Sequence, residues 1–215
     1  MMEQNQDQTN EVEQEENCPV EENTQDKDNT KKPSKVQRIR SAIFELLVYV
    51  AIIVVCVMVV PRYVIQRTIV DGTSMEATLQ DQDNLLVDKL SYRFSDPKRF
   101  DVIVFYPYGR ENEDYYIKRV IGLPGETVYI DEEGTIYIDG EVLNENFGKE
   151  VIQDPGRAYE PVKLGTDEYF VLGDNRNNSS DSRDPVVGNI HRDELIGKAW
   201  MRIYPFDQMC IIKHQ

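Results

Sequence analysis

An uncharged apolar run constrains this chain more than any other feature. Leu46 to Val60 read LLVYVAIIVVCVMVV, and Ser41 to Phe44 extend the run apart from Glu45. Together they provide the roughly 20 residues that a helix needs to cross a bilayer. The run starts about forty residues into the chain and ends in Pro61-Arg62 without an A-x-A cleavage site, which argues against a removable signal sequence. We therefore predict one transmembrane helix over residues 41–62.

Basic residues around this run predict its direction. Such residues favour the cytoplasmic side of a membrane. Five of them precede the run and only two follow it closely: Lys31, Lys32, Lys35, Arg38 and Arg40 before it, Arg62 and Arg67 after it. We expect a single-pass protein of the cell membrane, with the lipid bilayer as a partner, the N-terminus in the cytoplasm and residues 63–215 outside.

The first 30 residues carry ten Asp or Glu and one Lys, within a chain of formal net charge −15. A segment this acidic and this poor in large apolar residues cannot bury enough surface to offset the entropy of ordering it. We predict a disordered cytoplasmic tail over residues 1–40, with a basic end next to the membrane. A docking arm for a cytoplasmic partner is the alternative. The acidic charge makes nucleic acid a poor partner.

After residue 67 the sequence changes to short β-rich runs separated by turns. Val128 to Ile130 and Thr135 to Ile138 flank a turn as a hairpin, and Asp139-Gly140 begins a second turn. The polar stretch 144–165 predicts a long excursion from the sheet. We therefore predict a mostly β fold: an antiparallel β domain over 63–215, with an inserted loop or subdomain at about 131–168. Its predicted strands lie in NLLVDKLSYRF, DVIVFYPY, YYIKRVIGL, ETVYIDEEGTIYIDGEVL, EYFVLGD and KAWMRIYPF.

The cysteines predict neither a disulfide framework nor a zinc site. Cys18 lies in the acidic tail, Cys56 in the apolar run and Cys210 near the C-terminus, and CxxC spacing is absent. The polar loop Gly173 to Pro185, GDNRNNSSDSRDP, is too poor in ligands for calcium: Arg176 occupies the third position of a loop starting at Asp174, and no Glu closes it. We expect no metal and no cofactor, and we interpret this loop as the scaffold of a site.

Two residues suggest nucleophilic chemistry. Ser74, in VDGTSMEATL, lies between the apolar run and the first predicted strand, but a serine in a glycine-containing turn is usually only a turn residue. The chain has only His191 and His214, and the G-x-S-x-G elbow is missing, so a histidine base is poorly supported. Lys118 is the alternative base, because a buried lysine is neutral near physiological pH.

The strand pattern around Lys118 supports its burial. In YYIKRVIGL a strand places Tyr116, Lys118 and Val120 on one face and Arg119 on the other. An edge-strand lysine whose stem lies along apolar surface is the plain structural alternative.

Four segments, SMEATL, RFDVIVF, YIKRVIGLPGE and GDNRNNSSDSRDP, together resemble the ordered motifs of the type I signal peptidase (leader peptidase) family. The resemblance covers about residues 70–205. It implies a membrane-anchored serine endopeptidase with a Ser-Lys dyad, which removes signal peptides from secreted preproteins on the outer face of the membrane. The alternatives are a non-catalytic tethered β domain that binds an envelope or secreted partner, and a protease with a specialised substrate set.

The resemblance also implies roles for individual residues. Ser74 matches the nucleophile, Lys118 the general base and Ser179 the hydroxyl that orients this lysine. The remaining matches support the site or line shallow pockets for small side chains. The supporting residues are Arg119, Asp174, Asp181 and Arg183, and the pocket residues are Val70, Met75, Leu79 and Ile117.

Two positions depart from the family pattern, and a third lacks a side chain that could assist the reaction. Ala77 stands where proline is common, and Asn177 stands where an Asp is usual. We expect the first to loosen the turn after Ser74 and the second to remove a charge from the supporting network. Gly72 has no hydroxyl to stabilise an oxyanion, so the backbone N–H of Ser74 becomes the main candidate.

Overall fold

The structure is a computed structural model that describes residues 34–111 and 114–214. Most of the tail predicted over residues 1–40 therefore lies outside the described residues. The contacts within the chain divide it into two units, residues 1–45 and 46–215. Everything that bears on the candidate site lies in the second unit.

A continuous helical segment opens the described part of the chain. It consists of α1 (Lys35–Val54), the π-helical turn η1 (Val55–Val59) and α2 (Val60–Tyr63). The π turn ends two residues before Pro61. The proline nitrogen has no N–H to donate, and its ring crowds the preceding turn, which disturbs regular α-helical bonding there. Among the described residues, Lys35–Tyr63 is the one helix that is long and apolar enough to cross a membrane, and it buries none of its residues in the protein.

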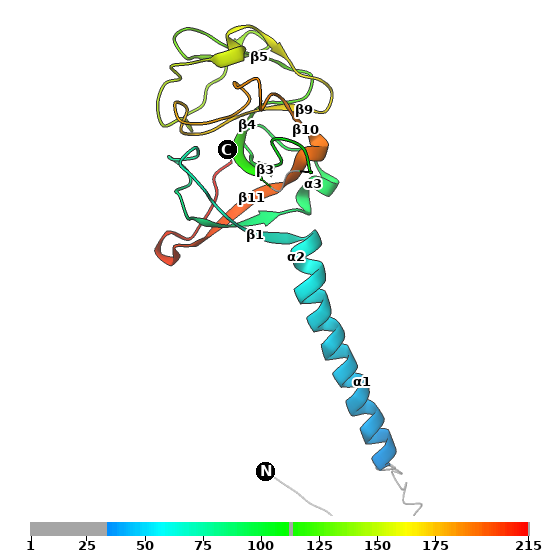
Figure 1. Cartoon of the computed structure of the whole chain (residues 1–215). Coiled ribbons are helices and arrows are strands. Elements are labelled where there is room, and N and C mark those ends of the chain that lie inside the picture. Colours follow the sequence, from blue (N-terminus) through cyan, green and yellow to red (C-terminus); the bar gives the residue numbers. More distant parts are fainter. Residues whose placement is uncertain (1–33, 112–113, 215) are drawn as a thin grey trace, which may run out of the picture. The chain divides into compact units, whose positions relative to one another are not determined.

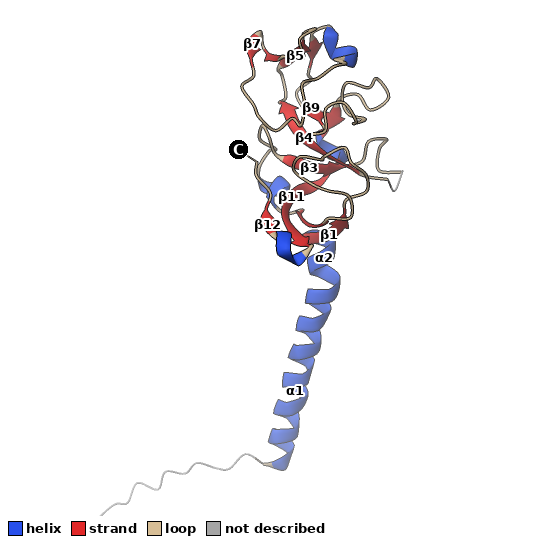
Figure 2. Cartoon of the chain, turned by 90° about the vertical axis from the view of Figure 1, so that its left-hand side faces the viewer, coloured by secondary structure: helices blue, strands red, loops and turns tan. Residues whose placement is uncertain are grey.

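The main body of the second unit is an eight-stranded sheet (Figures 1 and 2). Its hydrogen-bonded order is β1-β2-β11-β3-β4-β9-β10, and β12 pairs with β11. All neighbouring strands are antiparallel. The strands are β1 (Ile65–Ile69), β2 (Asn84–Asp88), β3 (Val102–Phe105), β4 (Tyr116–Gly122), β9 (Glu168–Leu172), β10 (Ile190–His191), β11 (Leu195–Tyr204) and β12 (Cys210–Ile211).

A smaller sheet of four strands has the order β7-β6-β5-β8. Its members are β5 (Thr127–Ile130), β6 (Ile136–Ile138), β7 (Glu141–Val142) and β8 (Val162–Lys163). The predicted hairpin is confirmed, because Val128 pairs with Ile138 and Ile130 with Ile136. At the second turn Asp139 and Gly140 both have positive φ, at 52° and 87°, as a type I′ turn requires.

The predicted fold class is confirmed: the fold is mostly antiparallel β with an inserted part, preceded by one apolar helix. One predicted strand is partly wrong. Ser91–Phe94 form the helical turn α3 rather than a continuation of β2. The Asp88 carboxylate accepts the backbone N–H groups of Leu90 and Ser91, at 2.8 and 3.1 Å, and so bends the chain out of the sheet. The strand β1 was not predicted.

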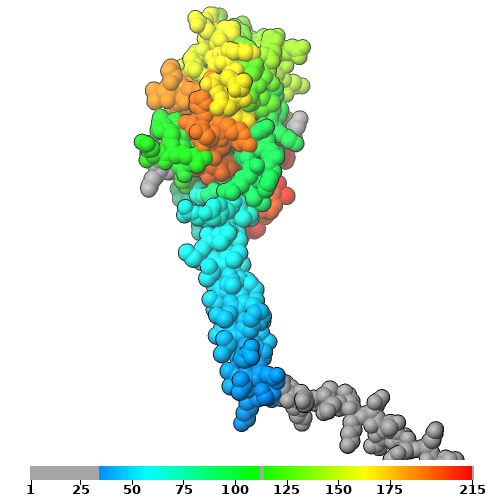
Figure 3. Space-filling model, turned by 90° about the vertical axis from the view of Figure 1, so that its right-hand side faces the viewer, coloured from blue at the N-terminus to red at the C-terminus, as the bar shows by residue number. Residues whose placement is uncertain are grey.

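Short 3₁₀ turns complete the elements: η2 (Gly156–Tyr159), η3 (Arg192–Glu194) and η4 (Phe206–Gln208). Buried side chains form three clusters. One of them, around Ile121, Val128 and Phe170, joins the large sheet to the small one. In the space-filling view the residues of the small sheet and its loops, coloured green-yellow to yellow, lie next to the orange residues that follow β9 (Figure 3). Hydrogen bonds join the loop after β9 to the inserted segment, through Glu145 and Val151.

Candidate active site

Ser74 lies in the turn segment between β1 and β2, and the loop after β9 fixes it there. The Ser74 carbonyl oxygen accepts the backbone N–H of Asn175 at 3.0 Å. The Asn175 side-chain amide donates to the Thr73 carbonyl at 3.0 Å, and that of Asn178 donates to the Thr73 hydroxyl at 2.8 Å. Segments about a hundred residues apart in sequence thus hold the Ser74 backbone.

Lys118 lies in the middle of β4, between β3 and β9, so it is not the edge-strand lysine of the structural alternative. Its side chain is directed toward Ser74, and Nζ donates a hydrogen bond to Ser74 Oγ at 2.7 Å. Only 4% of Lys118 is exposed. Within the described residues no carboxylate lies within ion-pair distance of this amine.

Burial changes the protonation of this amine. Loss of solvation lowers the pKa of Lys118 from 10.5 to about 8, although the charges of Asp181 and Asp174 act in the opposite direction. These carboxylates are themselves engaged by arginines, so their attraction for the lysine is shared. The lysine thus has an accessible neutral form near physiological pH, as a general base requires.

The Ser74 and Lys118 side chains line an open cavity of about 580 Å³. Val70, Met75 and Ile117, three of the four residues predicted to line substrate pockets, belong to its lining and are buried. Leu79 does not line this cavity, because its side chain packs into the hydrophobic cluster beneath it. Apart from Ile69 and Gly72, the rest of the lining is polar or aromatic and includes Asp71, Asp114, Tyr115 and Tyr116.

A hydrogen-bond donor that could stabilise a developing oxyanion is present beside the Ser74 hydroxyl. Among the hydrogen bonds of the described residues, none uses the backbone N–H of Ser74 as donor. Gly72 contributes no side chain, and its own N–H donates to Asp81 at 2.9 Å. The geometry therefore leaves the Ser74 N–H as the donor beside the hydroxyl that would attack.

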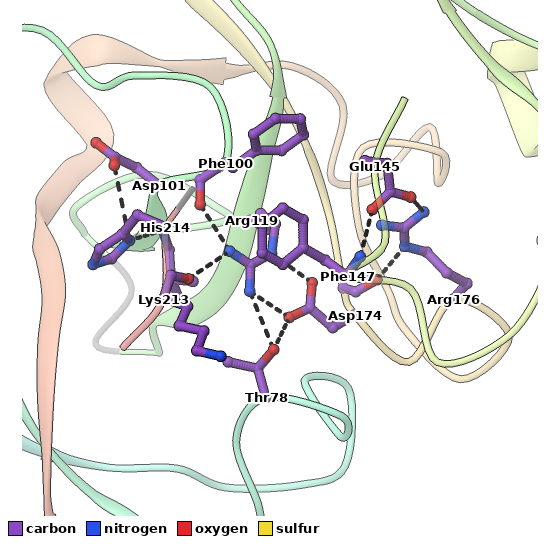
Figure 4. Close-up of polar contacts among 12 residues, drawn as sticks. Thr78, Phe100, Asp101, Arg119, Glu145, Phe147, Asp174, Arg176, Lys213 and His214 are labelled. Atoms are coloured by element: carbon purple, nitrogen blue, oxygen red, sulfur yellow. Dashed lines mark hydrogen bonds and ion pairs between the residues drawn. The ribbon is translucent and has the colours of Figure 1, made fainter. Parts of the chain in front are cut away.

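On the opposite side of β4, Arg119 organises the support of the site (Figure 4). It is completely buried and forms a bidentate pair with Asp174, at 2.8 and 2.7 Å. Its remaining N–H groups donate to the carbonyl oxygens of Phe100 and Lys213 and to the Thr78 hydroxyl. A buried arginine satisfied in this way is a rigid part of the structure rather than a mobile charge.

A second buried pair shapes the loop after β9. Asp181 accepts two bonds from the Arg183 guanidinium, both at 2.9 Å, and the Gly173 N–H at 3.0 Å. Arg183 also donates to the Arg176 carbonyl at 2.5 Å, which closes the loop on itself. Arg176 in turn pairs with Glu145, from the loop after β7, at 2.7 Å (Figure 4). The four predicted supporting residues, Arg119, Asp174, Asp181 and Arg183, thus form two buried ion pairs, whose carboxylates act on the charge of Lys118.

Ser179 does not form the predicted contact with Lys118. Its Oγ is buried and has no hydrogen-bond partner among the described residues. This hydroxyl lies beside Gly173, where an added Cβ would overlap it and would also lie 2.5 Å from the Ser74 carbonyl oxygen. Gly173 thus has a steric reason to be glycine, because it lets the loop approach both serines.

The two departures from the family pattern have distinct structural settings. Ala77 has φ 118°, a region that L-residues rarely adopt and that the ring of proline excludes. The Asn177 amide donates to the Glu150 carboxylate at 3.2 Å and the Val151 carbonyl at 3.0 Å, and its oxygen accepts the Gln153 N–H at 2.9 Å. An Asp could not donate the first two bonds, so Asn177 links the loop to the inserted segment rather than weakening it.

Sequence reasoning missed Thr78. Its hydroxyl donates to Asp174 at 2.5 Å and accepts from Arg119 at 3.1 Å, so it connects the Ser74 turn to the buried ion pair. A threonine in a turn carries no sequence signal for such a role. No three His, Cys, Asp or Glu side chains are placed to hold a metal ion within residues 34–111 and 114–214.

Comparisons with known proteins agree on one family. Residues 43–204 match the family model described as signal peptidase, peptidase S26. The chain is 41% identical to a probable signal peptidase I-2 from Synechocystis over 65% of its length, which covers 63% of that relative. It is 42% identical to a signal peptidase I from Leptolyngbya laminosa over 63% of its length, which covers 67% of that protein.

Other matches include a Gram-positive relative and a solved structure. Signal peptidase I T of Bacillus subtilis is 36% identical over 63% of the chain and 72% of that relative. A crystal structure of a signal peptidase I from Enterococcus faecalis has 34% identity and a TM-score of 0.40, over 48% of this chain and 97% of that one. The chain thus spans just under two thirds of the length of the Synechocystis relative.

Proposed function

Because the chain belongs to the peptidase S26 family of signal peptidases, we propose that it is a membrane-anchored serine endopeptidase that removes signal peptides from preproteins. The observation that carries this proposal is the 2.7 Å hydrogen bond between Lys118 Nζ and Ser74 Oγ in an open cavity. A lysine so placed, desolvated and without a carboxylate partner among the described residues, suits a general base.

The mechanism begins with neutral Lys118, which accepts the proton of Ser74 Oγ as this oxygen attacks the scissile carbonyl. The tetrahedral oxyanion accepts a hydrogen bond from the Ser74 N–H. Lys118 then gives its proton to the leaving amine, and an acyl-enzyme on Ser74 remains. In the second half Lys118 takes a proton from a water molecule as its oxygen attacks the ester carbonyl. The bond to Ser74 Oγ then breaks, Lys118 returns the proton to this oxygen, and the new carboxyl end leaves.

Support for the proposed substrate comes from the cavity. Val70, Met75 and Ile117 present an apolar floor beside Ser74, and such a floor suits the small side chains that end a signal peptide. Leu79 contributes by packing behind this floor rather than by contacting substrate.

We propose that the helix Lys35–Tyr63 is the anchor and that residues after it face outward, in a single-pass arrangement. Its exposed apolar side chains need a lipid environment, since the described residues do not cover them. Anchoring confines the catalytic pair to the membrane surface, where the cleavage site of a translocated preprotein emerges. This shortens the search for a productive encounter.

The test is cleavage of a preprotein by the full-length chain in detergent or lipid vesicles. We expect Ser74→Ala and Lys118→Ala each to abolish cleavage, whereas the matched controls Ser95→Ala and Lys98→Ala retain it. Because Ser74 and Lys118 act as one proton-transfer unit, the double variant should be hardly slower than either single variant. Substantial turnover by either single variant would contradict the dyad.

The alternative is a tethered β domain that binds an envelope or secreted partner without cleaving it. It predicts that wild type and Ser74→Ala bind the same protein equally and that neither produces a cleaved fragment. A specialised protease would instead cleave some preproteins and leave others intact. A panel of preproteins that differ only in their signal peptides separates these cases.

A further inference from the structure

A second cavity, of about 490 Å³, lies away from the Ser74–Lys118 site and has an unusual charge. We call it the basic cavity. Half of its ten lining residues are cationic, and none carries a carboxylate. Its lining is Arg62, Tyr63, Lys89, Tyr92, Arg93, Tyr106, Arg110, Arg192, Leu195 and Ile196.

Five parts of the second unit bring these cations together, and one of them is the turn η3, which carries Arg192. Arg62 lies in α2 and Lys89 directly follows β2, whose end is held to α2 by the Lys89 N–H donating to the Val64 carbonyl at 2.9 Å. Arg93 lies in α3 and Arg110 in the loop after β3. Arg110, Arg192 and Lys89 donate hydrogen bonds to the Asp193 carbonyl, the Tyr92 and Ser95 carbonyls and the Gln66 side chain, but these neutral acceptors do not offset the repulsion among the like charges.

The protein itself neutralises little of this charge. Arg192 pairs with Asp96 at 2.9 Å, and this is the one ion pair formed by a lining residue among the described residues. Arg62 and Arg93 instead lie against the Tyr63 ring, with their guanidinium carbons 5.8 and 5.4 Å from its centroid. Desolvation by burial, together with the nearby charges of Arg93, Arg62 and Arg110, lowers the pKa of Lys89.

The position of the cavity indicates what could supply the missing negative charge. Arg62 and Tyr63 end the apolar helix, so the cavity lies where the chain leaves that helix. The segment Lys89 to Phe94 also combines apolar and basic side chains, the two kinds that are found at a bilayer surface. Leu90 and Phe94 are exposed, Phe94 by 84%, while Lys89 and Arg93 line the cavity. Apolar residues of this kind enter the acyl boundary, and basic ones reach phosphate groups.

We propose that the basic cavity binds the phosphate headgroup of an anionic phospholipid. Guanidinium groups suit phosphate because they donate paired hydrogen bonds to its oxygens. The proposal rests on the membrane anchoring proposed above, but it does not depend on Ser74 or Lys118. Lipid binding and cleavage are therefore measured separately, and one can fail while the other holds.

The experiment is native mass spectrometry of the full-length chain released from neutral detergent micelles. Phosphatidylglycerol and phosphatidylcholine are titrated in parallel, and inorganic phosphate forms a third arm. We expect tight, saturable binding of one phosphatidylglycerol, weaker binding of phosphatidylcholine, and no comparable binding of inorganic phosphate.

The test variant is Arg62→Gln/Arg93→Gln. Its control, Lys98→Gln/Lys163→Gln, removes the same amount of charge at two residues outside the cavity lining. Each basic residue near a membrane surface contributes about a fivefold gain in affinity for anionic lipid, so the test variant should bind phosphatidylglycerol about 25-fold more weakly. The control should bind like wild type. If Arg62→Gln/Arg93→Gln melts at a lower temperature than wild type, Lys89→Gln/Arg110→Gln replaces it.

Three results would overturn the proposal. The first is equal phosphatidylglycerol affinity in the test and control variants. The second is equal affinity of wild type for the two lipids. The third is inorganic phosphate that binds as tightly as phosphatidylglycerol, which would assign the cavity to a soluble anion instead.

Discussion

Lys118 is the residue whose setting governs most of the predicted behaviour. It is held on an interior strand, almost fully buried, and bonded through Nζ to Ser74. Two consequences follow from the lowered pKa of this amine, one for the rate of cleavage and one for the stability of the fold.

The first prediction concerns the pH dependence of cleavage. Below pH 8 the Lys118 amine is mostly protonated and cannot accept the Ser74 proton, whereas above its pKa of about 8 it is mostly neutral. We expect kcat/KM for a preprotein to rise about tenfold per pH unit below 8 and to level off above it. If kcat/KM kept rising until pH 10.5, Lys118 would titrate like an ordinary exposed lysine, and the prediction would be wrong.

The second prediction concerns stability. Because folding lowers the Lys118 pKa from 10.5 to about 8, the unfolded chain binds more protons between these values, and the stability of wild type should rise with pH across that window. At pH 7 the amine destabilises the fold by about 3 kcal/mol. Lys118→Met should therefore melt at a higher temperature than wild type at pH 7, and this advantage should shrink by pH 10. Equal melting temperatures at pH 7 would contradict this.

The third prediction concerns Ala77, whose φ of 118° carries strain of about 1–3 kcal/mol. Glycine adopts such a conformation without a Cβ penalty, so Ala77→Gly should raise the melting temperature of the chain. Ala77→Pro should lower it and slow cleavage, since proline fixes φ near −65° and would displace the Ser74 turn. A stabilising Ala77→Pro would mean that this turn has another backbone conformation.

At the scale of elements, the loop after β9 supplies the bonds that hold the Ser74 turn. It brings Asp174, Asn175 and Asp181 to the site, and it can do so only because Gly173 permits close approach to the Ser74 carbonyl. The position of Ser74 therefore depends on how the loop after β9 packs against its turn.

The fourth prediction tests this close approach. A methyl group on Gly173 meets the Ser74 backbone and the Ser179 side chain, whereas one on Gly165 meets only the flexible Glu168 side chain. Gly173→Ala should lower cleavage at least about tenfold and destabilise the fold by about 1–3 kcal/mol. Gly165→Ala, the matched control, should do neither. The measurements are cleavage rate and thermal melting, and wild-type values for Gly173→Ala would contradict the packing.

The sequence predicted elements well where a local pattern specified them. The Val128–Ile138 hairpin followed from its turn, and the resemblance in four motifs led to the family that the comparison confirmed. A local side-chain cap was missed at Ser91, where the Asp88 carboxylate bends the chain out of the sheet. Non-local effects were not accessible, and the role of Thr78 is one of them, because it depends on contacts with Arg119 and Asp174 that only the folded chain brings near. Rotamers are equally hidden, as the unmade Ser179–Lys118 contact illustrates.

At the scale of the whole molecule, the fifth prediction concerns topology. Five basic residues before the apolar helix favour a cytoplasmic N-terminus, so protease added outside sealed cells should digest the β domain and leave residues before Lys31 protected. Antibodies to epitope tags at each end give the measurement. Cells opened with detergent, in which both parts are digested, provide the control. Protection of the β domain in sealed cells would reverse the orientation.

The strand β4 displays Lys118 to the cavity and Arg119 to the buried ion pair, two neighbouring cations on opposite faces of one sheet. A slip of one residue in the pairing of β4 with β3 would exchange these faces and set a permanently charged guanidinium beside Ser74. A molecule with that register would lack a neutral amine beside the hydroxyl. The alignment of β4 with β3 thus decides which of two neighbouring cations reaches Ser74.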